Sequence, residues 1–122
     1  MYQASYIYRV PVENIDRFLR VVTEAGEIYC RHGALSSVTL RVTAGATKYG
    51  CTGLCDLVPP AGPDEALFVG LDSFREVEEF RAKMKLIDSD PRIGELFEEI
   101  QSLIDLKKII RWEAESAIRD GV

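Results

Sequence analysis

Two hydrophobic patterns of different period follow one another directly in the first 33 residues. Residues 2–10 alternate between two sides, which is typical of a β-strand. Over residues 15–29 apolar side chains recur at three- and four-residue steps, which predicts an amphipathic helix. Arg31 and His32 would complement the negative end of the helix dipole, and Gly33 can adopt the left-handed conformation that ends a helix. This unit points to a mixed architecture of sheet and helix.

A second strand–helix–strand order follows along the chain. The strand pattern returns in three places, at residues 35–43, 66–71 and 107–116. Between the last two, Ser73 and Glu76 have the spacing of a capping box that would open one helix. Asp90 followed by Pro91 predicts the start of another helix.

The order of these elements predicts an α+β, ferredoxin-like βαββαβ fold. Its four-stranded antiparallel sheet would carry all helices on one face, with an extra helix before the last strand. We expect residues 1–122 to form a single domain, with an irregular loop at 44–65 and a flexible tail at 117–122. The uncovered sheet face should be apolar enough to need a cover, so we predict a homodimer.

Charge and hydropathy exclude several partners. The net charge of −5 argues against nucleic acid, whose binding needs a basic face. No apolar run approaches the length that crosses a bilayer, and the N-terminus has no signal-peptide pattern, so neither membrane binding nor secretion is expected. Three cysteines fit free thiols better than a disulfide framework, and a cytoplasmic location is the expectation.

Two segments carry a resemblance to a known family. Residues 10–35, from Val10-Pro11 to His32-Gly33-Ala34-Leu35, and the segment Ser89-Asp90-Pro91-Arg92 resemble an uncharacterised domain family within the dimeric α/β-barrel superfamily. The resemblance implies that two ferredoxin-like sheets pair into a barrel. The superfamily includes cofactor-free and haem-degrading monooxygenases as well as ligand binders, so fold is implied more strongly than activity.

The chain departs from this family in two places. The family tends to show Tyr-x-Asp-Gly-Phe in the first strand, whereas this chain reads Tyr2-Gln3-Ala4-Ser5-Tyr6, so any role of that acid is absent. The loop at residues 47–63 also looks different, which separates this chain from any substrate that the family shares.

Three residues are candidates for catalysis: His32, Tyr6 and Trp112. His32 is the only histidine, and imidazole is the side chain that most often serves as a general base near neutral pH. Its place at a helix end nevertheless favours a structural role that complements the helix dipole. All three would lie near substrate if the chain were a cofactor-independent or haem-degrading monooxygenase, as the resemblance allows.

Cys51 and Cys55 could bind a soft metal ion as thiolates, with Cys30 or His32 as further ligands. Structural zinc sites usually show two closely spaced ligand pairs, which this sequence lacks. Ordinary thiols are therefore favoured, and neither a metal nor a cofactor is expected.

The sheet face opposite the helices is the predicted ligand surface. We expect the most apolar side of the second and third strands to pack on the helices: Val38, Leu40, Val42, Leu67, Val69 and Leu71. The open face would then carry Arg9, Arg41, Arg111 and Phe68. Guanidinium groups match carboxylate and phosphate, so this face would suit a small anionic ligand. The alternative is an ion-pair network with Glu113 across a dimer.

If the two faces are inverted, the aromatic residues Tyr6, Tyr8 and Trp112 line the cavity instead. A flat hydrophobic or quinone-like ligand would then be favoured. Lys48 and Tyr49 could touch a ligand if their loop closes over the mouth of the barrel.

The sequence therefore predicts a dimeric α/β-barrel protein that binds a small molecule. A monooxygenase and a purely structural dimerisation module are the two alternatives. The character of the cavity distinguishes them, because a filled interface would leave assembly as the only role.

Overall fold

The computed structural model describes residues 1–58 and 64–117, and its central element is strand β1. Pairing is antiparallel throughout, in the order β2-β3-β1-β4. The strands are β1 (Tyr2–Pro11), β2 (Ser36–Arg41), β3 (Glu65–Phe74) and β4 (Ile110–Glu115). This confirms the predicted four-stranded ferredoxin-like sheet.

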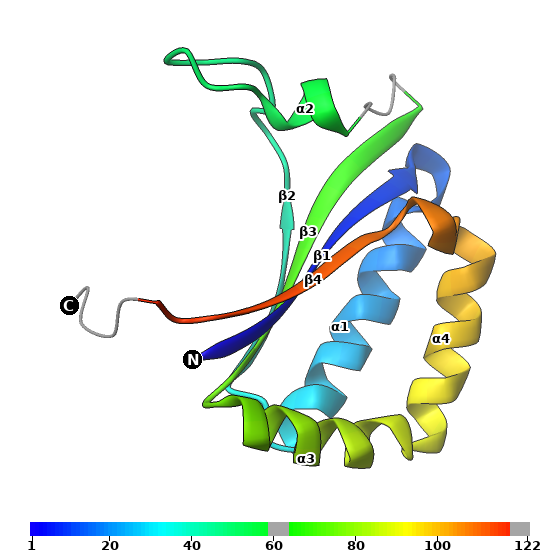
Figure 1. Cartoon of the computed structure of the whole chain (residues 1–122). Coiled ribbons are helices and arrows are strands. Elements are labelled where there is room, and N and C mark those ends of the chain that lie inside the picture. Colours follow the sequence, from blue (N-terminus) through cyan, green and yellow to red (C-terminus); the bar gives the residue numbers. More distant parts are fainter. Residues whose placement is uncertain (59–63, 118–122) are drawn as a thin grey trace.

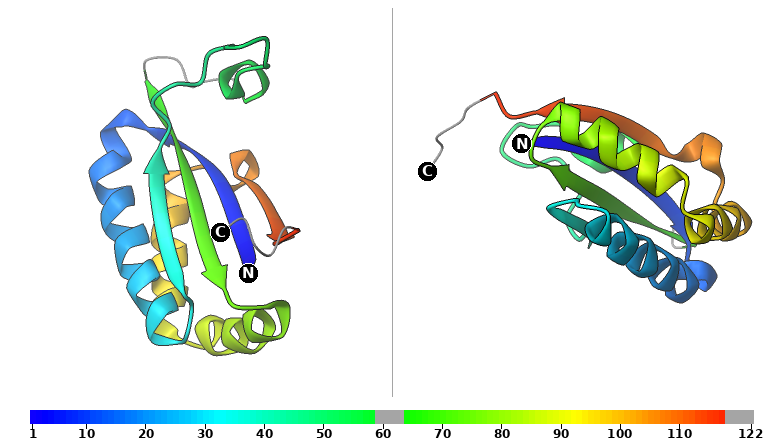
Figure 2. Two further views of the ribbon diagram at one scale, coloured as in Figure 1. Left: turned by 90° about the vertical axis from the view of Figure 1, so that its left-hand side faces the viewer. Right: turned by 90° about the horizontal axis from the view of Figure 1, so that it is seen from below.

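Three long helices cover one face of this sheet, while a short helix, α2, lies on the other side (Figures 1 and 2). The helices are α1 (Ile15–Arg31), α2 (Leu54–Leu57), α3 (Val77–Asp88) and α4 (Pro91–Leu103), with one-turn 3₁₀ helices η1 (Val12–Asn14) and η2 (Leu106–Lys108). Of the helices in the described residues, none combines the length and the apolar character needed to span a membrane.

Helix α1 ends where the sequence predicts. Gly33 has φ 113°, and the Ala34 amide donates to the Tyr29 carbonyl at 3.0 Å. The side of α1 that faces the sheet buries Phe18, Val21 and Ile28. The apolar stripe is thus what holds α1 on the sheet.

Of the two predicted helix starts, one is confirmed and one is wrong. Asp90 caps α4, because its carboxylate accepts a hydrogen bond from the Arg92 amide at 3.0 Å. Ser73, however, lies within β3, and the N-cap of α3 is Glu76 without a side-chain bond. The hydroxyl of Ser73 instead accepts from Gln3 at 3.0 Å across the β1–β3 pair, which keeps this segment in the sheet.

The predicted assignment of sheet faces is correct for the first strand and wrong for the other three, including β4, where Arg111 pairs with Tyr6 and lies on the helix side. Phe68 packs on Phe18 of α1 with ring centroids 5.4 Å apart, which turns the even-numbered side chains of β3 toward the helices. The odd-numbered ones, and Val38 and Leu40 opposite them, therefore point away. Phe68 decides this orientation because its ring fills the space between sheet and helix, which leucine and valine do not.

The sheet surface opposite the helices is here called the open face. Its side chains are Gln3, Ser5, Ile7, Arg9, Val38, Leu40, Leu67, Val69, Leu71, Ile110, Trp112 and Ala114. Leu40 is 50% exposed and Trp112 42% exposed. One end of the face is covered, since Val58 packs with Ile7 and Leu67.

The predicted irregular loop at 44–65 is only partly irregular. It contains α2 and a tight turn with a bridge between Lys48 and Cys51. Residues 59–63 of this loop, and residues 118–122 of the predicted tail, lie outside the described residues.

Candidate functional site

A cavity of about 720 Å³ lies between the sheet and the three long helices. We call it the inner cavity. Tyr6 and Tyr8 of β1, Gly70 and Asp72 of β3 and Arg111 of β4 form its sheet side. Its helix side is mostly apolar and includes Val22, Ala25, Tyr29, Met84, Ile93, Leu96, Phe97 and Ile100. The size and the apolar walls with a few polar groups are those of a small-molecule site.

Glycines at two positions leave room beside this cavity. A Cβ at Gly70 would come within 2.9 Å of the Tyr8 ring, and one at Gly26 within 3.0 Å of the Ser37 hydroxyl. Any larger residue at Gly70 would therefore push the tyrosine ring from its place. The absence of a side chain keeps this part of the sheet floor open.

Tyrosines supply the polar groups of the aromatic wall. The rings of Tyr6 and Tyr8 are stacked with centroids 5.7 Å apart, and Tyr8 packs edge-on against Phe18 at 5.1 Å. Burial raises the pKa of Tyr6, Tyr8 and Tyr29. These phenols therefore stay protonated at physiological pH and can donate hydrogen bonds.

Asp72 places a carboxyl group inside the cavity. It lies on β3 between two apolar stretches, and the Ser37 hydroxyl donates to it at 2.6 Å. Burial raises the pKa of Asp72, while the hydrogen bond from Ser37 and the charge of Arg111 oppose that rise. A carboxyl with a raised pKa can hold or release a proton closer to neutral pH than an ordinary aspartate can.

Arg111 joins the cavity to a polar chain along β4. Its Nε donates to the Tyr6 hydroxyl at 3.4 Å, and its Nη1 lies 2.7 Å from the Glu113 carboxylate. Glu113 in turn accepts from the Tyr2 hydroxyl at 2.6 Å. The guanidinium is thus held in place from two sides, which prepares it to orient a ligand oxygen.

Of the three predicted catalytic candidates, the structure places only Tyr6 in the inner cavity. The Nε2 of His32 lies 3.1 Å from the Asp90 carboxylate, so His32 ties the end of α1 to the start of α4. Trp112 is on the open face, opposite Ser5 of β1.

The predicted arginine surface is also divided. Arg41 lies over the Phe68 ring at 5.7 Å, on the helix side, and Arg111 lines the inner cavity. Only Arg9 is on the open face. The prediction that these residues form one anion-binding surface is therefore wrong, because it rested on inverted faces of β2, β3 and β4.

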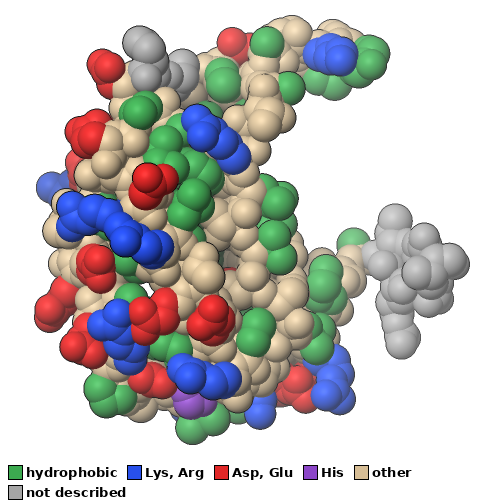
Figure 3. Space-filling view, turned by 180° about the vertical axis from the view of Figure 1, so that it is seen from behind, with side chains coloured by type: hydrophobic (Ala, Val, Ile, Leu, Met, Phe, Trp, Pro, Cys, Tyr) green, Lys and Arg blue, Asp and Glu red, His purple; other side chains and the backbone are tan. Residues whose placement is uncertain are grey.

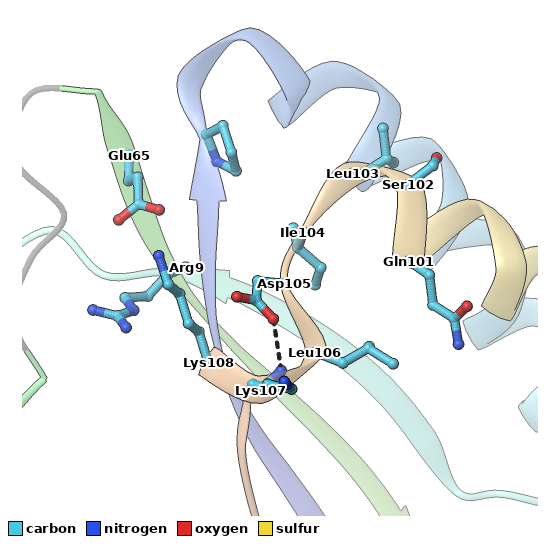
Figure 4. Close-up of a pocket in the computed structure, with 11 residues that line it drawn as sticks. Arg9, Glu65, Gln101, Ser102, Leu103, Ile104, Asp105, Leu106, Lys107 and Lys108 are labelled. Carbon is cyan, nitrogen blue, oxygen red and sulfur yellow. Dashed lines mark hydrogen bonds between the residues drawn. The ribbon is translucent and has the colours of Figure 1, made fainter.

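Arg9 instead lines a second hollow, of about 690 Å³, at the end of the sheet. Figure 4 shows Arg9 and Lys108 pointing toward the same region as Glu65. Other parts of its wall, such as Gln101 and Asp105, are exposed and polar. This end hollow lacks the apolar enclosure that a small-molecule site needs, so the inner cavity is the candidate site.

Cys51 and Cys55 are free thiols of the β2–β3 connection, and Cys30 is a free thiol on α1. Within residues 1–58 and 64–117, no group of three or more His, Cys, Asp or Glu side chains is arranged to hold a metal ion. That all three cysteines are ordinary thiols without a metal stays a prediction.

Sequence reasoning missed Asp72, Ser37 and Tyr29 as cavity residues. Asp72 was the one with a visible signal, because a lone carboxylate directly follows the apolar run 66–71. Tyr29 belongs to the apolar stripe of α1, and nothing in the stripe distinguishes a core ring from a cavity wall. Ser37 becomes visible only through its contact with Asp72.

Residues 1–103 match the model of a family described as a protein of unknown function, DUF1428. The chain belongs to this DUF1428 family. The match confirms the family resemblance carried by residues 10–35 and 89–92. No match was found among curated proteins.

Solved structures with low sequence identity share the fold of this DUF1428 protein. A dimeric ferredoxin-like protein from an uncultured marine organism has a TM-score of 0.62 at 15% identity, covering 98% of this chain and 97% of its own. An uncharacterised NIPSNAP domain protein from Burkholderia xenovorans has a TM-score of 0.58 at 13% identity, with 96% and 95% covered. SnoaB, a cofactor-independent oxygenase from Streptomyces nogalater, has a TM-score of 0.55 at 11% identity, with 98% of both chains covered.

The raised pKa of Asp72 predicts an effect on stability. A carboxyl whose pKa is higher in the folded than in the unfolded state makes the fold lose stability as pH rises through the folded pKa. We expect Asp72→Asn to be more stable than the wild type at pH 8, and the gain to shrink as pH falls toward 3.8, the ordinary aspartate pKa. Urea unfolding across this pH range measures the difference.

The exposed residue Asp88, also at the cavity, provides the control. Asp88→Asn should change stability much less. A lower stability of Asp72→Asn at pH 8 would contradict the electrostatic account of Asp72.

Proposed function

We propose that this protein is a homodimer in which each chain binds a small, flat, mainly apolar molecule in its inner cavity. The observation that carries the proposal is that Asp72, Arg111 and three tyrosines line the cavity, whose other walls are mostly apolar. Such a site favours an aromatic ring system with one or two oxygen atoms, as in phenols and quinones. The ligand class is that of the inverted-face alternative of the sequence analysis, although Trp112 lies on the open face and not in the cavity.

The polar groups lie on the sheet side of the cavity, which supports an oriented ligand. Arg111 donates hydrogen bonds only, whereas the Asp72 carboxyl can donate or accept according to its protonation. A ligand carbonyl or hydroxyl would therefore face β3 and β4. Its ring would lie against Val22, Ala25 and the other apolar side chains of the helices.

The open face supports the homodimer. Val38 and Leu40 are exposed on β2 and Ile110 and Trp112 on β4, the two edge strands, while Val69 and Leu71 of β3 lie on the same face between them. Exposed apolar side chains spread over one sheet face in this way normally mark an interface. A likeness to a dimeric ferredoxin-like protein is consistent with this arrangement. The cavity within each chain argues against assembly as the only role.

A cofactor-independent oxygenase is the second candidate, and Asp72 is the observation that favours it. A carboxylate near a bound phenol could remove the hydroxyl proton and so make the ring more reactive toward dioxygen. One fold relative is described as such an oxygenase.

We also propose a cytoplasmic location, because Cys30 and Cys51 are exposed free thiols.

Ligand binding can be tested with 2-hydroxy-1,4-naphthoquinone by isothermal titration calorimetry. We expect binding by the wild type and about a 5-fold weaker affinity for Tyr29→Phe, which removes one hydroxyl and keeps the ring. Ala25→Phe should fill the cavity and weaken binding about 10-fold or more. Ser102→Phe, in the end hollow, is the control and should leave the affinity unchanged. Equal affinities in all variants would move the site away from the inner cavity.

The homodimer can be tested by sedimentation velocity at micromolar concentration. Trp112→Asp places a charge in the middle of the proposed interface, where its desolvation has no compensation, so a monomer is expected. Leu86→Asp changes an exposed residue of α3 on the other side of the molecule and should remain dimeric. A wild type that sediments as a monomer would exclude the homodimer.

For the oxygenase, 1-naphthol and dioxygen would give 1,4-naphthoquinone and water. One atom of the dioxygen would enter the quinone and the other the water. We expect oxygen uptake that increases as the pH rises and the Asp72 carboxyl, whose pKa burial raises, loses its proton, and at least a 10-fold lower rate for Asp72→Asn at pH 8. An oxygen electrode and the absorbance of the quinone measure the reaction, with Asp88→Asn as the control. Uptake no faster than without protein would leave 1-naphthol oxygenation out of the protein's activities.

A further inference from the structure

The connection between β2 and β3 contains a structured projection, residues 43–57, which we call the arm. It stands out on the side of the sheet opposite the three long helices (Figures 1 and 2). In the space-filling view the arm overhangs the body and leaves an open angle beneath it (Figure 3). The arm is therefore directed toward whatever lies on the open face.

Internal contacts hold the arm in shape. The Cys55 amide donates to the Gly45 carbonyl at 3.0 Å, and the Thr47 hydroxyl donates to the Asp56 carboxylate. A Cβ at Gly45 would overlap the sulfur of Cys55, and one at Gly53 would overlap the Gly45 carbonyl. Such close packing describes a preformed element, which loses little entropy on binding a partner.

The tip of the arm presents an aromatic ring on a tight turn. Lys48 and Cys51 pair through an isolated antiparallel β-bridge of their backbones. Between them, Tyr49 has φ 56° and Gly50 has φ 76°. A positive φ is uncommon for a residue with a side chain and persists where the structure imposes it. Tyr49 is 90% exposed, so this conformation contributes nothing to the core of its own chain. Rigidly held tyrosines of this kind are frequent centres of binding energy in protein interfaces.

The base of the arm continues the open face. Val42, Leu54 and Cys55 pack on the cluster formed by Ile7, Leu67 and Val58, whose first two members belong to that face. A second protein chain that packs on the exposed part of the open face would therefore also fill the space under the arm. The base of the arm is thus anchored on the open face by a buried apolar cluster.

Charge also favours a second copy of this chain as the occupant. The arm has two charged residues, Lys48 at its tip and Asp56 near its base, where the Thr47 hydroxyl donates to the Asp56 carboxylate, whereas the whole chain carries a net charge of −5. In Figure 3 a basic side chain lies together with hydrophobic ones at the end of the arm. A basic and aromatic tip is complementary to an acidic partner, and this chain is one.

We propose that the arm is a clasp that holds a second copy of this chain, with Tyr49 as its main contact residue. In a two-fold dimer each arm would reach over the other chain, so the same contact would occur twice. The inference rests on the homodimer proposed above and adds to it the element that secures the pair.

The test is the dimer dissociation constant of the full chain, measured by sedimentation over a dilution series. We expect Tyr49→Ala to raise it about 30-fold or more, because truncating a central tyrosine removes a large part of the binding energy. Tyr49→Phe keeps the ring and should stay close to the wild type. Lys48→Glu should weaken the dimer, more strongly at low salt than at high salt.

Circular dichroism melting of each variant as a monomer shows whether the fold is intact; Tyr49 is exposed, so little change is expected. A wild-type dimer with the same dissociation constant in Tyr49→Ala would exclude the clasp and leave the homodimer standing. A wild type that is monomeric throughout would exclude both. A weaker dimer in Tyr49→Ala but not in Tyr49→Phe would support the clasp.

Discussion

Strand β1 pairs with β3 on one side and with β4 on the other, so its alternating side chains set the character of both sheet faces. Its even-numbered residues carry the tyrosines that meet the helices, and its odd-numbered residues are smaller or more polar. Phe18 of α1 packs between Tyr8 and Phe68 and fixes the helix on this side. The cavity, the open face and the position of β4 all depend on this arrangement.

The inner cavity shows a conflict between stability and binding. Tyr6, Tyr8, Tyr29 and Asp72 are half-buried polar side chains, and their partial removal from water costs free energy in the folded protein. Gly70 also leaves space that a larger side chain could fill, although Tyr8 would have to move. Features of this kind are typical of ligand sites, because a core selected for stability alone would be closed and apolar.

The two sides of the sheet have different tasks in this account. In the function proposed above, the helix side provides the ligand site of each chain, and the open face with the arm provides the surface for a second chain. Because the proposed ligand site and the proposed dimer surface lie on opposite sides of the sheet, the second chain would not contribute residues to the cavity. The DUF1428 family and the structural relatives fix the fold, whereas the arm and Asp72 are features of this chain's own structure.

The sequence by itself determined the element order, the end of α1 at Gly33 and the cap at Asp90, because these depend on local periodicity and local hydrogen bonds. It determined that the sheet has two apolar sides but not which one the helices cover. Leu67, Val69 and Leu71 are as hydrophobic as the residues that pack on α1, so hydrophobicity could not decide. Only the tertiary structure did, through the fit of Phe68 against Phe18 and the cross-strand pairs that follow from it. The same packing brought together Asp72, Ser37 and Arg111, which lie far apart in the sequence.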